Sequence, residues 1–278
     1  MLGADPLKSL LAIDSWPSTH AASAVVAADG TVLGSHGDAD HRFALASVTK
    51  LLSSYAFLVA LEEGAFELDT PAGPEGSTVK HLLAHTSGYD FAERKVRFAP
   101  GDRRLYSNVG FEVLAETLEQ ATEMSFADYL GEAVLQPLGM DSTSLDGSAA
   151  ADGISTLGDL VLFATELQSP TLLDVQTHSQ ATHAVFPGLS GILPGYGRQT
   201  DNTWGLGFEI RSEKSPHWTG LLNSPETYGH FGQAGTFLWV DPALDAACVT
   251  LTDKPFGPWA VEAWTPFNDK VVSEISGR

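Results

Sequence analysis

The spacing of hydrophobic positions divides the chain into three parts, and the first part predicts a helix followed by a hairpin. Residues 6–15 carry apolar side chains at helical spacing after a proline. Residues 22–28 and 31–36 are short apolar runs joined by Asp29-Gly30, a dipeptide typical of β-hairpin turns. A further extended piece, residues 42–46, leads into the second part of the chain.

The second part opens with the most apolar segment of the chain. Val48 to Glu63 is apolar almost all round and is followed by Gly64, a residue typical of helix C-caps. A helix that is apolar on every side is normally buried. We therefore expect Ser47 to lie at the start of a buried helix.

From residue 65 to residue 200 the apolar runs become short, and several have helical spacing. Ser155 or Thr156 is a plausible N-cap for the last of these runs. We expect helices over residues 78–84, 110–121, 125–134 and 156–167, a stop at 136–140, and loops over 89–105 and 183–200.

Strand patterns return in the third part. Residues 204–210 form one run, and residues 228–241 and 246–253 form a pair joined by Asp241 to Asp245. A closing helix is expected from Pro258 onward. The order of strands, helices and strands predicts an α+β fold, in which both ends of the chain share an antiparallel sheet flanked by helices, with an all-helical insert lobe.

This order also predicts the domain organisation. We assign residues 1–66 and 201–278 to an α/β lobe with a central antiparallel sheet, and residues 67–200 to a helical lobe. The two lobes are expected to form a single cooperative unit with the site between them. A length of 278 residues is sufficient for such a unit.

Composition and charge narrow the possible partners. Hydrophobic residues make up 43% and charged residues 18%, which is typical of a globular chain. The net charge of −20 argues against nucleic acid or an anionic membrane as a partner. The sequence contains no apolar run of about 18 residues and no signal-like N-terminus, so we expect a cytoplasmic protein. Cys248, the single cysteine, lies in an apolar run and is expected to be buried.

A hydroxyl and an amine at Ser47 and Lys50 are the first candidate chemistry. Positions three apart share one face of a helix. In this S-x-x-K pairing the serine can attack a substrate while the lysine takes its proton. The chain contains a second copy at Ser77 and Lys80, so the spacing alone does not identify the nucleophile.

Two later segments add groups that such a reaction could use. Tyr106 and Asn108 are two apart before a predicted helix, so in an extended segment they point to the same side. A phenol can relay a proton, and an amide can bind a carbonyl oxygen or hold an amine. Residues 229–236 are rich in glycine, which lets a backbone approach a ligand closely.

Taken in this order, the segments resemble the serine β-lactamase and penicillin-binding-protein superfamily. The resemblance is greatest to class C β-lactamase-like esterases and D-aminopeptidase- or DD-peptidase-like hydrolases, and it implies a β-lactamase/transpeptidase-like fold. It covers residues 20 to 253 or thereabouts. The matching stretches are the nucleophile segment 43–52, Leu68-Asp69-Thr70-Pro71, the "LLxHTSG" stretch 79–88, Pro100-Gly101, Tyr106-Ser107-Asn108, 136–140 and 229–242.

The resemblance implies a role for each candidate residue. Ser47 would be acylated, and Lys50, with its pKa lowered by desolvation, would assist its deprotonation. Tyr106 would relay the proton and activate the deacylating water, and Asn108 would orient the acyl carbonyl or Lys50. The backbone N–H groups of Ser47 and Gln233 would form the oxyanion hole.

The same resemblance identifies Ser77 as structural. It falls within the "LLxHTSG" helix, where it is expected to be a cap. The nucleophile is therefore expected to be Ser47.

The third motif departs from that of the lactam-hydrolysing members. His230-Phe231-Gly232 stands where those members have Lys-Thr/Ser-Gly, so the hydroxyl that grips a substrate carboxylate is replaced by Phe231. We assign His230, Gly232 and Gln233 to substrate binding and the oxyanion hole. The departure favours a neutral or apolar acyl group over a β-lactam. The segment between Gly88 and Pro100 is also short for the family.

Other candidates have simpler interpretations. His81 and His85 have the spacing of a zinc pair, but the general-base glutamate of H-E-x-x-H is missing. Local hydrogen bonding of His85 near its helix end is therefore expected, and we expect no metal and no cofactor. Trp204, Trp218 and Trp239 either line a cleft or belong to the core.

We expect a serine hydrolase that cleaves a small-molecule ester, amide or peptide through an acyl-enzyme. Its activity would be esterase-like or like that of a D-amino-acid peptidase, ahead of β-lactamase. The alternative is a non-catalytic binding protein that keeps the fold. An α/β-hydrolase is excluded because no serine lies in G-x-S-x-G.

Overall fold

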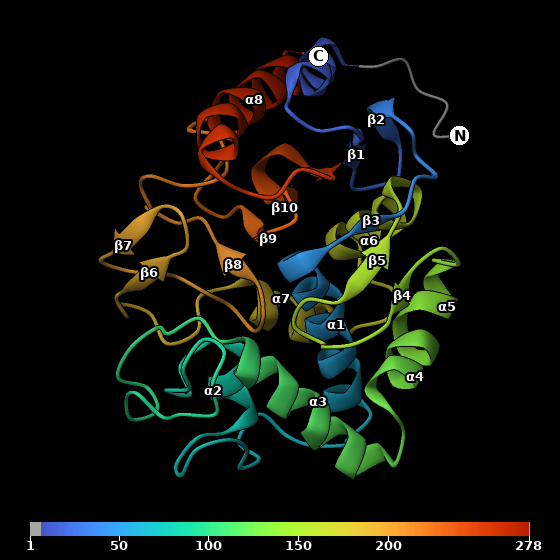
Figure 1. Cartoon of the computed structure of the whole chain (residues 1–278). Helices are drawn as coiled ribbons and strands as arrows, with labels where there is room; N and C mark the ends of the chain where they lie inside the picture. The colour runs from blue at the N-terminus through green and yellow to red at the C-terminus, as the bar shows by residue number, and fades with distance from the viewer. Residues whose placement is uncertain (1–6, 278) are drawn as a thin grey trace.

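The centre of the protein is a six-stranded antiparallel sheet with the strand order β2-β1-β11-β10-β9-β8 (Figure 1). The computed structural model describes residues 7–277. Val25 of β1 lies opposite Cys248 of β11, so the two ends of the chain share the sheet as predicted. The strands are β1 Ala21–Ala27, β2 Val32–Gly37, β8 Glu209–Ile210, β9 Tyr228–Gly232, β10 Thr236–Asp241 and β11 Ala246–Thr252.

Both faces of this sheet are covered. Val25, Trp239 and Cys248 point to one face, where α8 Pro258–Ser276 packs together with the 3-10 helix η1 Lys8–Ser15. Their neighbours along each strand belong to the core on the other face, which includes α1 Thr49–Glu62. Because both faces are buried, these strands read as nearly continuous apolar runs. Figure 1 shows α8 and η1 together at the top of the molecule.

Helix α1 is the buried helix that the sequence predicts. Residues 49–60 are all buried, and α1 contacts α3, α4 and η3. It follows directly on the short strand β3 Phe43–Ala44 and the 3-10 turn η2 Ala46–Val48. The other helices are α2 Val79–Leu83, α3 Asn108–Thr122, α4 Phe126–Leu130, the π-helical turn η3 Gly131–Leu135, α5 Gln136–Leu138, α6 Leu157–Gln168, α7 Val175–Thr182 and the 3-10 turn η4 Pro242–Leu244.

The insert is not all-helical, and that part of the prediction is wrong. Strands β4 Ser144–Leu145 and β5 Gly153–Ser155 join β3 in a three-stranded sheet. Strands β6 Gly191–Leu193 and β7 Gly197–Gln199 form a hairpin within the predicted loop 183–200. Strands of two or three residues are too short to show a period.

Helix α6 also departs from the simple division into lobes. It lies within residues 67–200 but packs against β1 and β11 of the central sheet. Its N-cap is Thr156, whose hydroxyl accepts from the backbone N–H of Asp159 at 3.2 Å. The division at residues 66 and 200 stays a prediction.

Two of the expected strands are shorter in the structure than predicted. Only Glu209–Ile210 of residues 204–210 is a strand, and residues 228–241 form two strands separated by a turn. Gly235 in that turn has φ +83°, and a Cβ there would lie 2.0 Å from the carbonyl oxygen of Lys254. The apolar residues on both sides of the turn hide it from a hydropathy pattern. The predicted helix over residues 6–15 is η1, and Pro6 lies outside the described residues.

Within residues 7–277, no helix is both long and apolar enough to cross a membrane. Cys248 is buried, as the sequence predicts.

Replacement of Trp264 in α8 tests the core between α8 and the central sheet. Trp264 is fully buried, so Trp264→Ala should lower the free energy of unfolding by roughly 3–5 kcal/mol. Val261→Ala on the same helix is the control, because Val261 is 37% exposed and should cost less than about 1 kcal/mol. Equal losses for the two variants in urea titrations would contradict this assignment of the core.

Candidate active site

The segment that carries Ser47 is held against the β9–β10 hairpin. The Thr236 hydroxyl donates to the carbonyl oxygen of Leu45 at 2.9 Å. A Cβ at Gly232 would lie 2.4 Å from that same oxygen, so only glycine permits this approach. Ala46 has φ +46°, and the chain turns there from β3 into α1. The hairpin therefore fixes the position of Ser47 in the 3-10 turn that leads into α1.

The amine of Lys50 is buried behind Ser47. Its Nζ lies 2.6 Å from Asn108 Oδ1, 2.9 Å from the carbonyl oxygen of Ala150 and 3.3 Å from Ser47 Oγ. Burial lowers the pKa of Lys50 well below its ordinary value, and the charge of Glu112 only partly opposes this. A neutral amine has two N–H donors and one lone pair. These match the two carbonyl-type oxygens and the Ser47 hydroxyl.

Tyr106 approaches Ser47 from the other side. Its hydroxyl donates to Ser47 Oγ at 2.8 Å. Burial raises the pKa of Tyr106, and the hydrogen bond to Ser47 opposes that shift only in part. The phenol therefore stays protonated and is a donor rather than a base in the resting site. Ser47 Oγ thus lies within hydrogen-bond reach of both an amine and a phenol.

His85 holds the Tyr106 segment in place. Its Nδ1 accepts from the backbone N–H of Ser107 at 3.1 Å, and its carbonyl oxygen accepts from that of Leu105 at 2.8 Å. The imidazole also lies 4.6 Å from the Tyr106 ring, centroid to centroid. The expected local hydrogen bond is made by the His85 backbone N–H, which donates to the Leu82 carbonyl oxygen at 3.2 Å, whereas the imidazole makes a long-range one. It links the "LLxHTSG" stretch to the Tyr106 motif.

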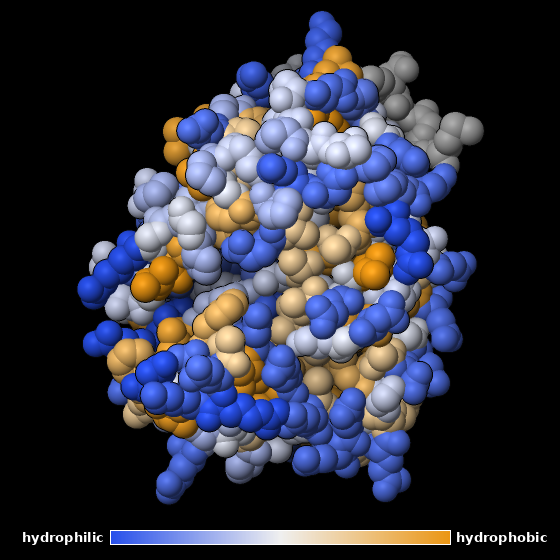
Figure 2. All heavy atoms as spheres, in the orientation of Figure 1, coloured by the Kyte–Doolittle hydropathy of each residue, from blue (hydrophilic) through white to orange (hydrophobic). Residues whose placement is uncertain are grey.

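A cavity of about 260 Å³ opens over Ser47. Its lining comes from both parts of the chain that the sequence assigns to separate lobes. Figure 2 shows a recess near the middle of the face on which these two parts of the chain meet. The lining residues are Ser47, Phe91, Tyr106, Leu193, Pro194, Trp204, Glu209, His230, Phe231 and Gln233.

The predicted site residues therefore occupy three positions. Ser47, Tyr106, His230 and Gln233 line the cavity. Asn108 and Lys50 lie behind Ser47, and Asn108 contacts the amine, which is one of its two expected roles. Gly232 is outside the lining and serves the close approach to Leu45.

His230 gives the cavity an uncharged polar wall. Burial and the nearby charge of Lys50 lower the pKa of His230 to about 3, so the ring is neutral at neutral pH. Its Nδ1–H donates to the carbonyl oxygen of Phe231 at 2.6 Å, which leaves Nε2 as an acceptor. Within residues 7–277 that Nε2 is buried and has no hydrogen-bond partner. The ring offers a lone pair where a cation would be needed for a carboxylate.

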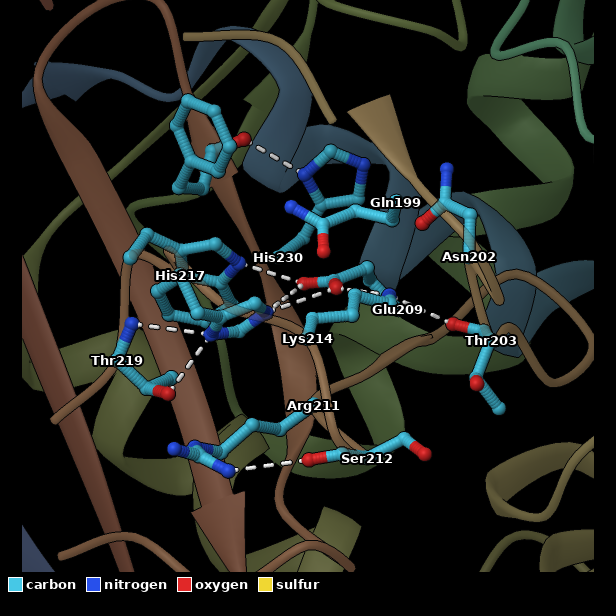
Figure 3. A network of polar contacts seen from close by, with 12 residues as sticks. Gln199, Asn202, Thr203, Glu209, Arg211, Ser212, Lys214, His217, Thr219 and His230 are labelled. Atoms are coloured by element: carbon cyan, nitrogen blue, oxygen red, sulfur yellow. Dashed lines mark hydrogen bonds and ion pairs between the residues drawn. The ribbon is translucent and has the colours of Figure 1, made fainter. Parts of the chain in front are cut away.

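Glu209 is the site residue that sequence reasoning missed. It is 2% exposed, lies on the cavity wall and forms a buried ion pair with Lys214 (Figure 3). Its carboxylate also accepts from His217 Nε2 at 2.9 Å and from Trp218 Nε1 at 2.5 Å. The Nδ1 of His217 accepts from the backbone N–H of Thr219 at 3.2 Å, so its proton is on Nε2.

This cluster keeps Glu209 ionised. Burial by itself raises the pKa of Glu209, but its interactions with His217 and Lys214 outweigh it and hold the pKa below its ordinary value. Burial lowers the pKa of both partners. Because the ordinary pKa of lysine lies about four units above that of histidine, Lys214 is the partner that carries the charge. The only signal in the sequence was an acidic residue within an apolar run, with lysine, histidine and tryptophan five to nine positions later.

The three tryptophans separate into different roles. Trp204 lines the cavity, Trp218 holds Glu209, and Trp239 lies in the core against α8.

The second S-x-x-K copy is not a matching site. Thr78, not Ser77, caps α2, and it forms a capping box with His81, so the predicted cap at Ser77 is wrong. No hydrogen bond joins Ser77 to Lys80 in the described chain, and the Lys80 amine lies over the Phe186 ring. Among residues 7–277, no group of three or more His, Cys, Asp or Glu side chains is placed to hold a metal.

The sequence model of the family described as Beta-lactamase matches residues 17–272. The chain belongs to the beta-lactamase family. It has the β-lactamase/transpeptidase-like fold that the sequence predicted.

A crystal structure of a beta-lactamase from Mycobacterium bovis is 52% identical, with a TM-score of 0.95 over 96% of this chain and 99% of that one. The hydrolase EstCE1 has a TM-score of 0.76 over 95% of this chain and 96% of that one, but at 18% identity it shows the fold alone.

A curated protein of Escherichia coli O157:H7, provisionally named a D-alanyl-D-alanine carboxypeptidase, is 26% identical over 253 residues. The match covers 71% of this chain and 56% of that protein. The chain thus spans about half the length of the curated relatives it matches.

Removal of the Glu209 charge tests the buried cluster. Glu209→Gln leaves the ammonium of Lys214 without its counter-charge, which should lower the free energy of unfolding by roughly 3–5 kcal/mol. In Glu209→Gln with Lys214→Met, the amide still accepts from Trp218 and no unpaired charge remains, so at least half of that loss should be recovered. A single variant within about 1 kcal/mol of wild type in guanidinium titrations would contradict this account.

Proposed function

We propose that this protein is a serine hydrolase that cleaves an ester or amide through an acyl-enzyme, with Ser47 as the nucleophile. The observation that carries the proposal is the position of Ser47 Oγ on the cavity wall. It lies 3.3 Å from Lys50 Nζ and 2.8 Å from the Tyr106 hydroxyl. The proposed base and proton donor are therefore both within hydrogen-bond reach of the nucleophile before substrate binds.

Ser47, Lys50 and Tyr106 each take a defined part in the proposed reaction. Ser47 Oγ forms a bond to the substrate carbonyl carbon while its proton passes to the neutral amine of Lys50. The bond to the leaving group then breaks, and the leaving atom takes a proton by way of the Tyr106 hydroxyl. Water repeats the sequence in reverse to release the acid, with Tyr106 and Lys50 returning the proton to Ser47.

The developing negative charge needs donors on the opposite side of the carbonyl. The proposed pair is the backbone N–H of Ser47 and that of Gln233, and both residues line the cavity. Thr236 and Gly232 support this pair because they bring the hairpin against the nucleophile segment. Each such donor contributes roughly 3–4 kcal/mol to transition-state stabilisation in other hydrolases.

The cavity walls favour a neutral acyl group. His230 is uncharged, Phe231 adds apolar surface, and the carboxylate of Glu209 is already paired with Lys214. A substrate carboxylate would find no free cation on these walls. We therefore propose esterase-like or peptidase-like hydrolysis of small molecules, ahead of β-lactam hydrolysis.

Intact-mass measurement after treatment with a fluorophosphonate probe tests the nucleophile. Wild-type protein should gain one adduct, Ser47→Ala should gain none, and its kcat/KM on p-nitrophenyl esters should fall by at least about 10³-fold. Ser77→Ala is the matched control, because it removes the serine of the other S-x-x-K copy and should label like wild type. An adduct that survives Ser47→Ala would refute the assignment.

The same measurements, extended to further substrates, test the alternative of a non-catalytic binding protein. No adduct and no turnover of an ester, a D-amino-acid amide and a β-lactam, with a specific ligand still bound, would favour the non-catalytic binding protein.

The pH profile tests Lys50 as the base. Because the neutral amine is the active form, kcat/KM on a neutral ester should rise with pH up to the lowered pKa of Lys50 and level off above it. His230, with a pKa of about 3, should add no limb above about pH 5.

Lys50→Arg should abolish this rising limb, because arginine stays protonated. It should also lower kcat/KM by about 10²–10⁴-fold. Lys80→Arg is the control and should leave the profile unchanged. A limb with the same pKa in Lys50→Arg would show that another group is the base.

A further inference from the structure

A second cavity adjoins the catalytic one. It has a volume of about 400 Å³ and shares Phe91, Tyr106 and Pro194 with the cavity over Ser47. It lies between the segment around residues 98–105 and the β6–β7 hairpin, and no step of the proposed reaction uses it. Its other lining residues are Phe98, Arg103, Arg104, Leu105, Ser190, Gly191, Ile192 and Arg198.

Three arginine residues, Arg103, Arg104 and Arg198, line this second cavity. The chain has only 15 basic residues against 35 acidic ones, so three around one cavity form a local positive region. Arg103 and Arg198 are exposed, and neither makes an ion pair within residues 7–277. The Arg103 guanidinium lies over the Phe98 ring at 4.5 Å from its centroid, which holds it at the cavity.

Arg104 adds a buried positive charge beside the second cavity. It is 2% exposed, and burial lowers its pKa only to about 10, so it stays protonated at neutral pH. Asp201 is the carboxylate that acts on its pKa, but no ion pair joins the two side chains in the described chain. Four of the five Arg104 N–H groups donate to backbone carbonyl oxygens, those of Ala84, Val185, Phe186 and Asn202.

The rim of the second cavity adds apolar surface. Phe91 is 49% exposed and Ile192 is 66% exposed, although both are large apolar side chains. Arginines next to exposed apolar groups suit a ligand with an anionic oxygen group on an apolar body. The excess of acidic residues in the rest of the chain makes this cavity a distinct place for an anion.

We propose that the second cavity binds the leaving group of the acyl donor, and that this leaving group carries a carboxylate or a phosphate. This inference rests on the proposed function. In that reaction the leaving atom takes its proton by way of Tyr106, and Tyr106 is the catalytic residue that both cavities share. The leaving group therefore departs towards Arg103 and Arg198, and the acyl group stays beside the neutral His230.

Matched esters test this assignment. Phenyl acetate is the neutral reference. Meta-carboxyphenyl acetate and meta-phosphonooxyphenyl acetate carry the negative charge on the leaving group. Monophenyl glutarate carries it on the acyl group instead. After correction for alkaline reactivity, kcat/KM for at least one charged acetate should exceed that of phenyl acetate by about tenfold. Added salt should reduce this preference. Comparison of the carboxylate-bearing acetate with the phosphate-bearing one shows which anion is preferred.

The double variant Arg103→Gln, Arg198→Gln should bring the preference to within about twofold of one. Its kcat/KM for phenyl acetate is measured in parallel, and the preference is taken as the ratio to that value. Arg97→Gln is the matched control: Arg97 is an exposed arginine that pairs with Asp90 and lies outside the cavity. It should keep the wild-type preference.

Three results would overturn the proposal: no preference in wild type, an undiminished preference in the double variant, or a preference for monophenyl glutarate. If no ester is turned over and Ser47 is not acylated, the proposed function fails on its own. The second cavity is then judged by calorimetric binding of meta-hydroxybenzoate and meta-hydroxyphenyl phosphate. Binding that the double variant loses supports it, and no binding of either anion refutes it.

Discussion

The buried amine of Lys50 is the constraint on which the site depends. A helix that is buried on nearly every side gives the amine no water, so the charged form is disfavoured and acceptors must come from the protein. Asn108 at the start of α3 and the carbonyl of Ala150 before β5 supply them. Helix α1, helix α3 and the segment before β5 are thereby fixed around one nitrogen. The same packing that stabilises the core sets the protonation state of the proposed base.

Two further contacts fix the groups that face Lys50. The β9–β10 hairpin reaches the nucleophile segment through Thr236, and His85 holds the backbone on either side of Tyr106. These contacts join residues 20 to 191 positions apart in the chain. The 2.8 Å distance between Ser47 and Tyr106 is therefore a property of the whole fold, and no single loop determines it.

Features with a short sequence range were predictable. The pairing of Ser47 with Lys50 follows from helical spacing, and the buried helix follows from its apolar run and Gly64. The roles expected of Tyr106 and Asn108 came from the resemblance of whole segments, because a single tyrosine or asparagine carries no such signal. The shared sheet followed from the order of strands and helices along the chain.

Features that depend on irregular backbone were not predictable. Lys214, His217 and Trp218 reach Glu209 from a segment without regular secondary structure between β8 and β9, so no period links them to it. The turn at residues 233–235 is flanked by apolar strands, and Thr78 rather than Ser77 caps α2 because the cap is decided by backbone conformation. In each case the deciding contact lies outside the range over which a pattern can be read.

Net charge describes the surface as a whole and says little about one cavity. A charge of −20 argues against a polyanionic partner, which must contact a wide area. A single carboxylate or phosphate contacts only a few side chains, so a local group of arginines is sufficient to bind it. His230 is neutral and Glu209 is already paired, so a free positive charge is missing from the described walls over Ser47. The proposed recognition of an anion therefore depends on the arginines beyond Tyr106.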